Sequence, residues 1–491
     1  MKEIKNIIGK NLKSILYVIV IFGIIIRFYF LNIAKSQAHW WDSLAYGSLA
    51  KNMIYHLWDN NPFLMHEAVI RPPLLPIIWS FLLRLGASDY TVILLTNLIP
   101  SIISIFLVYL IGKEMYGRKV GIIASIIASF SWIHIFYATR IMTDIPSMAL
   151  ILASIYFFII SHNELNLKHW SFSVFFLSLA VLFRYSHGVI AFAYIVFLVL
   201  VHKKKLIGNK KFWQGGLTGS IPIVLFIIIN IFTYGSILPA GEEYISSAGQ
   251  KAEFAWYTLG FLSHILRSPL VWLFYIGIIA ILYKTSISYG FILKEKETKM
   301  HIFNIIMLFT VLSFFIFGIK ASEDRYLLGL SGILFVIPAL SLSYIYNLLS
   351  KNKMELAAIV IILFLLWSAY SNIIFAQTMI TDKKETYKQM KDAFTWIKYN
   401  TPEKAVVTGE WADPYSIYYA EREIQVLSEN FNYTGFNLQA DYVVLTGLHQ
   451  VSPNFVEYVN DLVSKNLLVP VKAFFFDAEQ TKPAVIIYRR V

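Results

Sequence analysis

The chain has 491 residues, of which 57% are hydrophobic and only 15% are charged. Soluble domains usually carry about 25% charged residues, and a single hydrophobic core stops growing at about 250–300 residues. Most of this chain is therefore expected to face lipid. The net charge of +12 does not indicate nucleic-acid binding, because the Lys and Arg residues fall in short clusters between apolar runs. The chain has no cysteine, which excludes disulfides, thiolate zinc sites and cysteine nucleophiles.

Apolar segments that could cross a bilayer recur along the first three quarters of the chain. A helical span needs about 20 apolar residues, and the sequence predicts about eleven spans on this basis. They are 14–34, 91–111, 120–137, 145–160, 169–183, 188–201, 212–232, 269–283, 302–317, 326–349 and 356–375. The expected fold is mainly α, with a polytopic membrane domain over residues 1–375 and its first outer loop at 35–90.

Loop charges predict the orientation of these spans in the cell membrane. Every second loop is basic, with the residues Lys2, Lys5, Lys10, Lys13, Lys113, Arg118, Lys119, Lys203, Lys204, Lys205, Lys210, Lys211, Lys294, Lys296, Lys299, Lys351 and Lys353. The alternate loops carry the acidic residues Asp42, Asp59, Glu67, Asp89, Asp144, Glu242, Glu243, Glu253, Glu323 and Asp324. The positive-inside rule then places the N-terminus in the cytoplasm. This register requires the short apolar segment 74–85 to lie along the outer surface. The alternative is a short true span, which would flip the register and point the basic loops outward.

After residue 375, alternating and amphipathic patterns replace the continuous apolar runs. The sequence predicts helices at 387–399, 414–420 and 453–465, and strands at 405–408, 424–427, 442–445, 469–476 and 484–488. We expect a small extracytoplasmic α/β domain over residues 376–491. It contains no GxGxxG and no GxxxxGK[ST] motif, so a nucleotide-binding role is unsupported.

Asp42 is the first candidate for chemistry, because it directly follows a predicted span on the outer side. A carboxylate there can act as a general base, bind a cation, or be a solvated loop residue. Its neighbours Trp41 and Tyr46 are large rings with a polar edge, suited to stacking on a sugar or to anchoring in lipid headgroups. Headgroup anchoring explains the tryptophans but not the acid.

Asp144 is the second candidate, in a short outer loop between two spans. It precedes Ile145 and Pro146, so it is suited to capping the following helix, with Thr143 as a rival cap. The functional alternative is a second carboxylate on the same side as Asp42, with Arg140 beside it. The two acids are then expected to converge on one pocket.

Several arginines are predicted near the outer surface: Arg71, Arg140, Arg184, Arg267 and Arg325. An ionisable group in an apolar run is expensive unless it has a partner, and guanidinium groups suit phosphate recognition. The alternative is an arginine that snorkels or forms an ion pair. His66 and Glu67 lie side by side in the first outer loop, but no HxxxH or HExxH spacing indicates a metal site.

In this order and topology, the chain resembles the GT-C superfamily of membrane glycosyltransferases, and most of all its protein O-mannosyltransferase and lipid A aminoarabinose transferase branch. The motifs that carry the resemblance are 41–46, 71–76, 109–121, Thr143-Asp144, the hairpin at Arg184 and 324–328. The resemblance covers residues 14–350. It departs from the branch in having a single Asp in the first loop and Arg71 where His or Lys is common.

The resemblance implies a polyprenyl-phosphate-linked sugar that reaches the site from the bilayer, and an acceptor protein, lipid or glycan at the outer face. It implies catalytic roles for Asp42 and Asp144, the former as base or cation ligand, with Mg²⁺ or Mn²⁺ as an uncertain cofactor. Arg184, Arg325, Arg140 and Arg71 would then bind the donor phosphate. Trp41, Tyr46, Glu67 and His66 would bind sugar or acceptor.

The leaving group in such a reaction is a lipid phosphate, a weak base that needs cations more than a proton donor. One displacement would invert the anomeric centre. A covalent sugar–carboxylate step would need a second carboxylate about 5 Å away, and the sequence leaves that route open. The alternatives are a secondary transporter and a membrane-anchored sensor or binding protein. Transporters often show inverted repeats and mid-membrane charges, whereas the charges here gather at one predicted face.

Overall fold

The computed structural model describes residues 2–56, 58–239, 241, 260–287, 295–319, 323–350, 354–427 and 436–491, with side chains from residue 14 onward. These residues form two compact units. Unit 1 comprises Met1–Ile33 and Asp89–Ile380, and unit 2 comprises Ala34–Ser88 and Thr381–Val491. Some of the predicted loop charges lie outside the described residues: Glu242, Glu243, Glu253, Lys294, Lys351 and Lys353, together with the side chains of Lys2, Lys5, Lys10 and Lys13.

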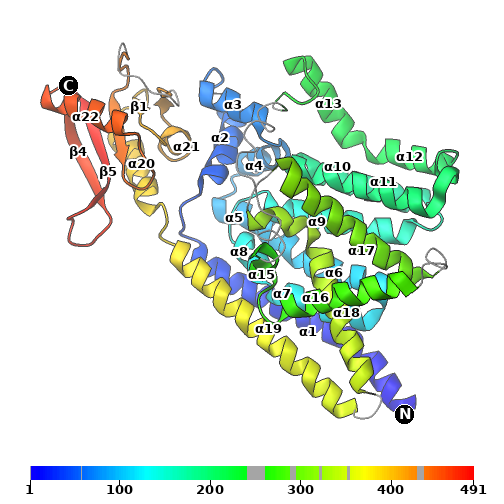
Figure 1. The fold of residues 1–491 in the computed structure, drawn as a ribbon. Coiled ribbons are helices and arrows are strands. Elements are labelled where there is room, and N and C mark those ends of the chain that lie inside the picture. Colours follow the sequence, from blue (N-terminus) through cyan, green and yellow to red (C-terminus); the bar gives the residue numbers. More distant parts are fainter. Residues whose placement is uncertain are drawn as a thin grey trace. The chain divides into compact units, whose positions relative to one another are not determined.

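The described residues of unit 1 form helices joined by short turns and loops, with no strand among them (Figure 1). Its first half contains α1 (Lys2–Ala34), α5 (Asp89–Ile93), η1 (Leu94–Leu98), α6 (Ile99–Tyr116), α7 (Arg118–Phe130), α8 (Trp132–Ala138), α9 (Asp144–Ser161) and α10 (Leu167–Phe183). These are followed by η2 (Tyr185–Gly188), α11 (Val189–His202), η3 (Lys203–Leu206), α12 (Lys210–Gly219) and α13 (Ile221–Tyr234). The last helices are α15 (Leu262–Leu266), α16 (Leu270–Ile287), α17 (Lys296–Ser313), η5 (Phe314–Ile319), η6 (Asp324–Leu330), α18 (Ser331–Leu349) and α19 (Met354–Lys383).

Each of the eleven predicted spans coincides with a helix or a helix pair. Within the described ranges, seven helices are long and apolar enough to cross a membrane, or up to nine if the bent pairs α7–α8 (51°) and α12–α13 (56°) each count as one span. The remaining two predicted spans correspond to the shorter apolar helices α10 and α16. The expectation of a mainly α, multi-pass membrane domain is confirmed.

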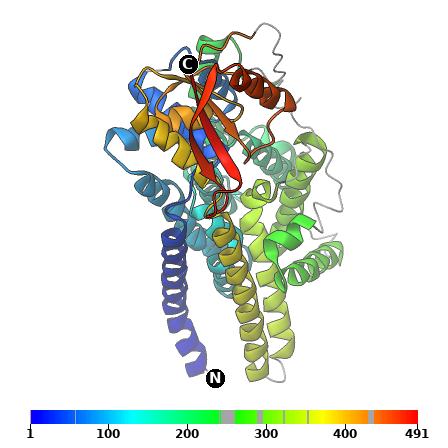
Figure 2. The same ribbon diagram turned by 90° about the vertical axis from the view of Figure 1, so that its left-hand side faces the viewer.

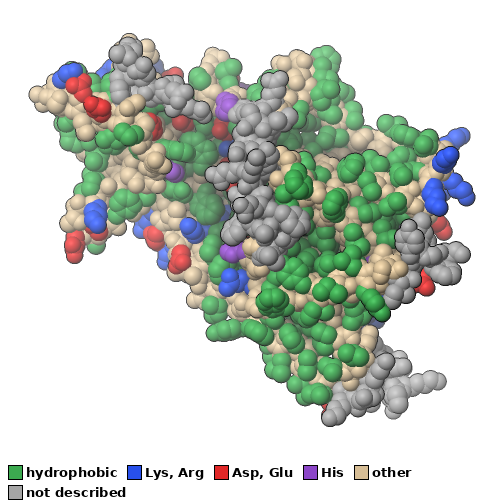
Figure 3. Space-filling model, viewed as in Figure 1, with side chains coloured by type: hydrophobic (Ala, Val, Ile, Leu, Met, Phe, Trp, Pro, Cys, Tyr) green, Lys and Arg blue, Asp and Glu red, His purple; other side chains and the backbone are tan. Residues whose placement is uncertain are grey.

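Large apolar side chains cover the outside of several unit 1 helices. Tyr17 on α1, Phe232 on α13 and Tyr370 on α19 are 67%, 86% and 68% exposed, and Figure 3 shows extensive hydrophobic surface over the helices of this unit. Contiguous apolar surface of this extent is typical of lipid contact. In both ribbon views (Figures 1 and 2) α1 and α19 run in the same direction. Exposed lysines gather in the turn between α11 and α12.

Unit 2 is an α/β unit built from two segments that lie far apart in the sequence. The first segment contributes α2 (Trp41–Tyr55), α3 (Pro62–Ile70) and α4 (Leu74–Arg84). The second contributes α20 (Lys388–Asn400), β1 (Val406–Thr408), α21 (Asp413–Tyr415), η7 (Ser416–Ala420), β2 (Glu423–Ile424), β3 (Tyr442–Thr446), α22 (Pro453–Ser464), β4 (Leu468–Phe475) and β5 (Pro483–Arg490).

The five strands form one sheet in the order β2-β1-β3-β5-β4. β1 pairs in parallel with β2 and β3, and β5 pairs antiparallel with β3 and β4. α22 packs on the sheet through Phe455 and Val459, which lie in one core cluster with Val443, Leu468 and Tyr488. The predicted elements of this region agree with the observed ones to within one or two residues, except that β2 is shorter than the predicted strand at 424–427.

Contacts between the two segments explain why the first outer loop belongs to unit 2. The Lys51 ammonium binds Glu421 and the Tyr418 carbonyl, each at 2.7 Å. The Tyr418 ring also packs edge-to-face on Trp79, with ring centroids 5.6 Å apart. Gly47 makes this packing feasible, because a Cβ there would lie 2.5 Å from the Tyr418 ring. The domain boundary predicted between residues 375 and 376 stays a prediction. In the structure, residues 34–88 form one compact unit with the C-terminal segment 381–491.

Candidate active site

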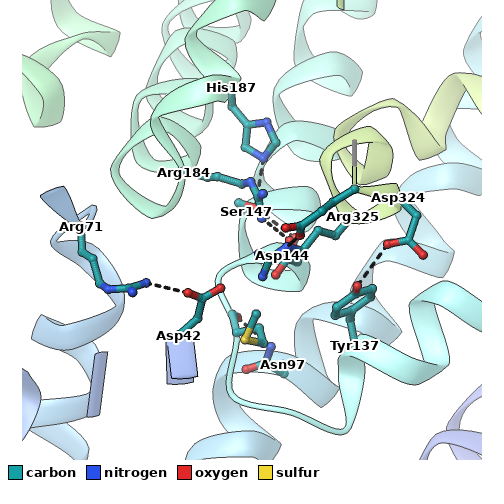
Figure 4. Close-up of polar contacts among 12 residues, drawn as sticks. Asp42, Arg71, Asn97, Tyr137, Asp144, Ser147, Arg184, His187, Asp324 and Arg325 are labelled. Carbon is teal, nitrogen blue, oxygen red and sulfur yellow. Dashed lines mark hydrogen bonds and ion pairs between the residues drawn. The ribbon is translucent and has the colours of Figure 1, made fainter. Parts of the chain in front are cut away.

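The candidate residues fall into two charged clusters, one in each unit. We refer to Asp42, Glu67 and Arg71 with their neighbours in unit 2 as the acid cluster. We refer to Asp144 and Arg184 with their neighbours in unit 1 as the arginine cluster. Figure 4 shows Asp42 and Arg71 of the first cluster and Asp144 and Arg184 of the second, with the polar contact within each pair.

In the acid cluster, Asp42 lies in the first turn of α2, where the positive end of the helix dipole favours a carboxylate. Asn61 caps α3 by accepting a hydrogen bond from the Leu64 N–H at 3.3 Å, and Pro62 occupies the first helical position. α3 then ends at Arg71, whose backbone is extended. This arrangement aims the Arg71 side chain at Asp42 (Figure 4).

The Arg71 guanidinium holds two carboxylates at once. Its Nη1 lies 3.1 Å from Asp42 Oδ1, and its Nε donates to Glu67 Oε2. Its plane lies 4.9 Å from the centre of the Tyr46 ring. Burial lowers the pKa of Arg71, but the charges of Asp42 and Glu67 outweigh this and raise it overall. In the structure, the Arg71 side chain is bound to the carboxylates of Asp42 and Glu67. Its role in binding the donor phosphate stays a prediction.

The other unit 2 candidates differ in exposure. Glu67 is buried at 4% exposure, whereas the adjacent His66 is exposed, so the two side chains do not share one environment. Trp41 packs edge-to-face on Phe63 and on Trp411, with ring centroids 6.0 and 5.3 Å apart. Trp41 therefore contributes to a wall of aromatic rings beside the acid cluster.

In the arginine cluster, Asp144 is the first residue of α9 and is 1% exposed. Its Oδ1 accepts a hydrogen bond from Arg184 Nη1. The residue at the N-cap position is Thr143, and its side chain makes no capping hydrogen bond. A buried carboxylate needs a partner, and here the partner is the guanidinium rather than the helix end.

Arg184 is held in place by the turn that carries it. It ends α10 with an extended backbone and is followed by the 3₁₀ turn η2. His187 on this turn lies 3.1 Å from Ser147 Oγ on α9, and the Arg184 guanidinium lies 4.6 Å from the centre of the Tyr326 ring. The hairpin, α9 and η6 thus meet at the Asp144–Arg184 pair.

The remaining predicted cations lie nearby in unit 1. Arg325 pairs with Glu323 and lies 5.9 Å from the Tyr326 ring centre. Arg140 is 6% exposed and donates to the Phe136 carbonyl at 2.9 Å while stacking 3.7 Å from the centre of that ring. The unit therefore brings Arg184 and Arg325 to one tyrosine, whereas the described contacts of Arg140 are with the helix that precedes it.

Three side chains whose environments stand out in the structure were not identified from the sequence: Tyr137, His264 and Asp413. Tyr137 donates a hydrogen bond to Asp324 at 3.2 Å, and His264 approaches the same carboxylate at 3.5 Å. Asp413, at the start of α21, has a buried Oδ1 without a hydrogen-bond partner in the structure. An Asp before a proline reads in sequence as an ordinary helix start, so no local signal marked it.

The fit of a divalent cation can be judged from the donor groups themselves. Among the residues that the structure describes, no three His, Asp or Glu side chains are grouped as a metal site requires. Asp42 and Asp144 are each paired with an arginine, whose positive charge opposes a dication at the same oxygens. Because Mg²⁺ is often held by one or two carboxylates together with water and substrate phosphate, a role for Mg²⁺ or Mn²⁺ stays a prediction.

Comparison with known proteins gives one family and several structures. Residues 70–229 match the family of dolichyl-phosphate-mannose-protein mannosyltransferases. No curated protein matches the chain significantly. Among solved structures, ArnT from Cupriavidus metallidurans in the apo state is similar with a TM-score of 0.66 and 10% identity, over 98% of each chain.

Two further structures contain lipid phosphates. ArnT from Cupriavidus metallidurans bound to undecaprenyl phosphate is similar with a TM-score of 0.63 and 10% identity, over 96% of this chain and 97% of that one. The archaeal oligosaccharyltransferase AglB from Archaeoglobus fulgidus, in complex with an inhibitory peptide and a dolichol-phosphate, is similar with a TM-score of 0.59 and 14% identity. The similarity covers 85% of this chain but only 64% of AglB, which is less than two thirds of that protein.

Proposed function

Because the chain has the fold of the GT-C glycosyltransferases, we propose that it transfers a sugar from a polyprenyl-phosphate donor to an acceptor protein, lipid or glycan. One observation carries this proposal: the similarity to ArnT bound to undecaprenyl phosphate extends over 96% of the chain, and so includes both units. The family match over residues 70–229 supports the same class of donor. The fold and the match also support an enzyme over a transporter or a sensor.

The arginine cluster suits the donor phosphate. When the bond between the sugar C1 and the phosphate oxygen breaks, negative charge accumulates on the phosphate. Arg184 and Arg325 meet around Tyr326 in unit 1, and guanidinium forks match phosphate oxygens. Asp144 binds Arg184 and fixes its position, and Arg140 lies on the loop that precedes Asp144.

The acid cluster suits the acceptor. The Asp42 side chain is 31% exposed, whereas those of Glu67 and Arg71 are 6% and 12% exposed. Asp42 is therefore the acid of this trio that an acceptor can reach. It either takes the proton of the acceptor group or orients that group for attack on C1, while Trp41 and Tyr46 contact sugar or acceptor. One displacement then inverts the anomeric centre.

We place the N-terminus in the cytoplasm and unit 2 outside the cell membrane. The support is the alternation of basic and acidic loops, for example Lys203–Leu206 between α11 and α12 and Asp144 at the start of α9. Cytoplasmic loops attract Lys and Arg.

The reaction steps proposed here need no divalent cation. The transfer rate in EDTA, with and without added Mg²⁺ or Mn²⁺, measures any such requirement.

The proposal is tested with purified protein in nanodiscs. Undecaprenyl phosphate carrying a labelled hexose or pentose is supplied together with acceptor protein, lipid or glycan, and release of free undecaprenyl phosphate is measured. We expect release with at least one donor, and a fall of about 10²-fold or more in Asp42→Asn and in Arg184→Ala. Asp59→Asn is the matched control, because Asp59 is exposed in the same loop.

Two outcomes would count against this function. If the wild-type protein releases no lipid phosphate from any hexose or pentose donor, the transferase assignment fails. If transfer proceeds and Asp42→Asn retains the wild-type rate while remaining folded, Asp42 loses its catalytic role.

A further inference from the structure

The C-terminal segment brings a further carboxylate, Asp413, alongside the helix that carries Asp42. Two contacts bracket it. The Trp411 ring packs on Trp41 with centroids 5.3 Å apart, and the Pro414 carbonyl accepts a hydrogen bond from Ser48 Oγ at 3.3 Å. Residues 41 and 48 are seven apart and so lie on one face of α2, separated by about 10 Å. Asp413 therefore lies along this face, within the first two turns of α2.

The Asp413 carboxylate differs from the other acids of the cluster. Asp42 and Glu67 are both bound to Arg71, whereas Asp413 Oδ1 is buried without a hydrogen-bond partner in the structure. Burial raises the pKa of Asp413 to about 7, the charge of Glu67 adds to the rise, and the residue's own backbone N–H opposes it. A buried oxygen without a partner is expensive, which points to a group that the folded protein keeps in reserve for a ligand.

We propose that Asp413 is a further catalytic residue, which takes the proton of the acceptor group while Asp42, held by Arg71, orients that group. This inference rests on the proposed function. The acceptor O–H or N–H bond breaks and its proton goes to the Asp413 carboxylate. The acceptor atom forms a bond to C1 of the sugar, and the bond between C1 and the phosphate oxygen breaks with its electron pair leaving on the lipid phosphate. A carboxylate, an acceptor O–H or N–H and a sugar-linked lipid phosphate therefore become a carboxylic acid, a glycosylated acceptor and a lipid phosphate that leaves with one more negative charge.

Base strength is the reason to choose Asp413 over its neighbours. A carboxylate oxygen that already accepts a hydrogen bond from a guanidinium is not available to take a proton from the acceptor. Asp42 and Glu67 are both in that position. A general base works best when its pKa lies near the working pH, and Asp413 meets this condition through burial.

Asp413 and its neighbours Trp411, Pro414 and Tyr415 are surrounded by groups from α2, α3, α20 and η7, and by the His449 ring, which stacks on Trp411 with centroids 4.8 Å apart. α3 presents Glu67, the one charge within the described residues that shifts Asp413. α2 presents Ser48 and Trp41, and α20 presents Phe394, whose ring stacks on Tyr415 at 5.7 Å. His449 is a second titratable group packed beside this segment, and burial lowers its pKa. Burial and the charge of Glu67 are the causes that raise the pKa of Asp413.

The test is the pH profile of sugar transfer in the full-length protein, using whichever undecaprenyl-phosphate sugar the wild type turns over. We expect the wild-type kcat to rise as pH increases through about 7 and then to level off, because the base must be ionised. Asp413→Asn should lower kcat by about 10²–10⁴-fold and remove this rise. Asp413→Glu should retain the rise with a displaced midpoint.

Asp461→Asn is the matched control, since Asp461 is an exposed acid of the same unit, paired with Lys465. A wild-type profile that is flat between pH 5 and 9 would overturn the inference even if Asp413→Asn does not fold. The inference is also overturned if folded Asp413→Asn shows the kcat and the pH profile of the wild type. In that case the transferase assignment survives. Absence of transfer by the wild type overturns both, so the two failures are distinguishable.

Discussion

Arg27 Nη1 lies 2.9 Å from the carbonyl oxygen of Ser129, at the break between α7 and α8. Arg27 is fully buried, and the same side chain binds Ser101 Oγ at 2.7 Å and the Ala128 carbonyl at 3.3 Å. The last carbonyls of a helix lack partners within it. The 51° bend between α7 and α8 leaves carbonyl groups at the end of α7 without helical partners. Arg27 donates hydrogen bonds to two of these carbonyls instead.

Replacing Arg27 should destabilise unit 1 at this bend. Arg27→Met leaves several buried oxygens without donors, at about 1–3 kcal/mol each, so its thermal midpoint in detergent should fall well below that of the wild type. Arg27→Lys, with three donors, should lie between them. Ile25→Ala is the control, because Ile25 is on the same helix and 57% exposed. Equal midpoints for Arg27→Met and wild type would contradict this role.

Asp144 and Arg184 should behave as one coupled pair. Removing one partner of a buried ion pair costs about 3–5 kcal/mol, because the other charge stays buried alone. Asp144→Ala and Arg184→Ala should each lower the free energy of unfolding, and the double variant should be more stable than the sum of the two losses predicts. Chemical denaturation of all four proteins gives the coupling energy. Strict additivity would show that the pair does not act as a unit.

Gly47 should not tolerate a side chain. A Cβ at this position would meet the Tyr418 ring at 2.5 Å and Trp79 at 2.9 Å, in the packing between the two segments of unit 2. Gly47→Ala should therefore expose unit 2 to limited proteolysis. Gly216→Ala serves as control, since nothing lies within 4 Å of its added Cβ and alanine favours a helix. Matching digestion patterns for the two variants would refute the close packing.

The raised pKa of Asp413 should also be visible in stability. Its pKa is about 7 in the folded protein against 3.8 for an ordinary Asp. Between these two pH values the folded protein holds the proton and the unfolded chain releases it. Stability from this group falls as pH rises from about 4 to 7 and then stays level. Because Asn does not ionise, Asp413→Asn should gain thermal stability relative to wild type over this window. A difference in midpoint that is the same at pH 5 and pH 8 would argue against the raised pKa.

The local structure was largely predictable from the sequence. The helix at 387–399 was expected to stop before Thr401 and Pro402, and α20 ends at Asn400. The segment 74–85 was too short to span, and it forms the 11-residue helix α4. Asp42 and Asp144 were identified because acids between apolar runs are rare.

What depends on distant contacts was not predictable. Arg27 is the one charged residue in the apolar run 14–34, which was a usable signal, but its carbonyl partners lie about a hundred residues away. In the sequence, Asp413 has the pattern of an ordinary first residue of a helix. Its buried environment arises from packing on α2, which involves residues far away in the chain. The convergence of Asp42 and Asp144 stays a prediction, because each lies in a separate compact unit.

The discontinuous make-up of unit 2 also sets an order of events during synthesis. Ala34–Ser88 leaves the ribosome long before Thr381–Val491, with the whole of Asp89–Ile380 made in between. At about 5–20 residues per second, that delay lasts on the order of tens of seconds. Through that interval Asp42 and Arg71 have been translated but Asp413 has not, so a ribosome that stalls in the last helices leaves a membrane-inserted chain incapable of turnover.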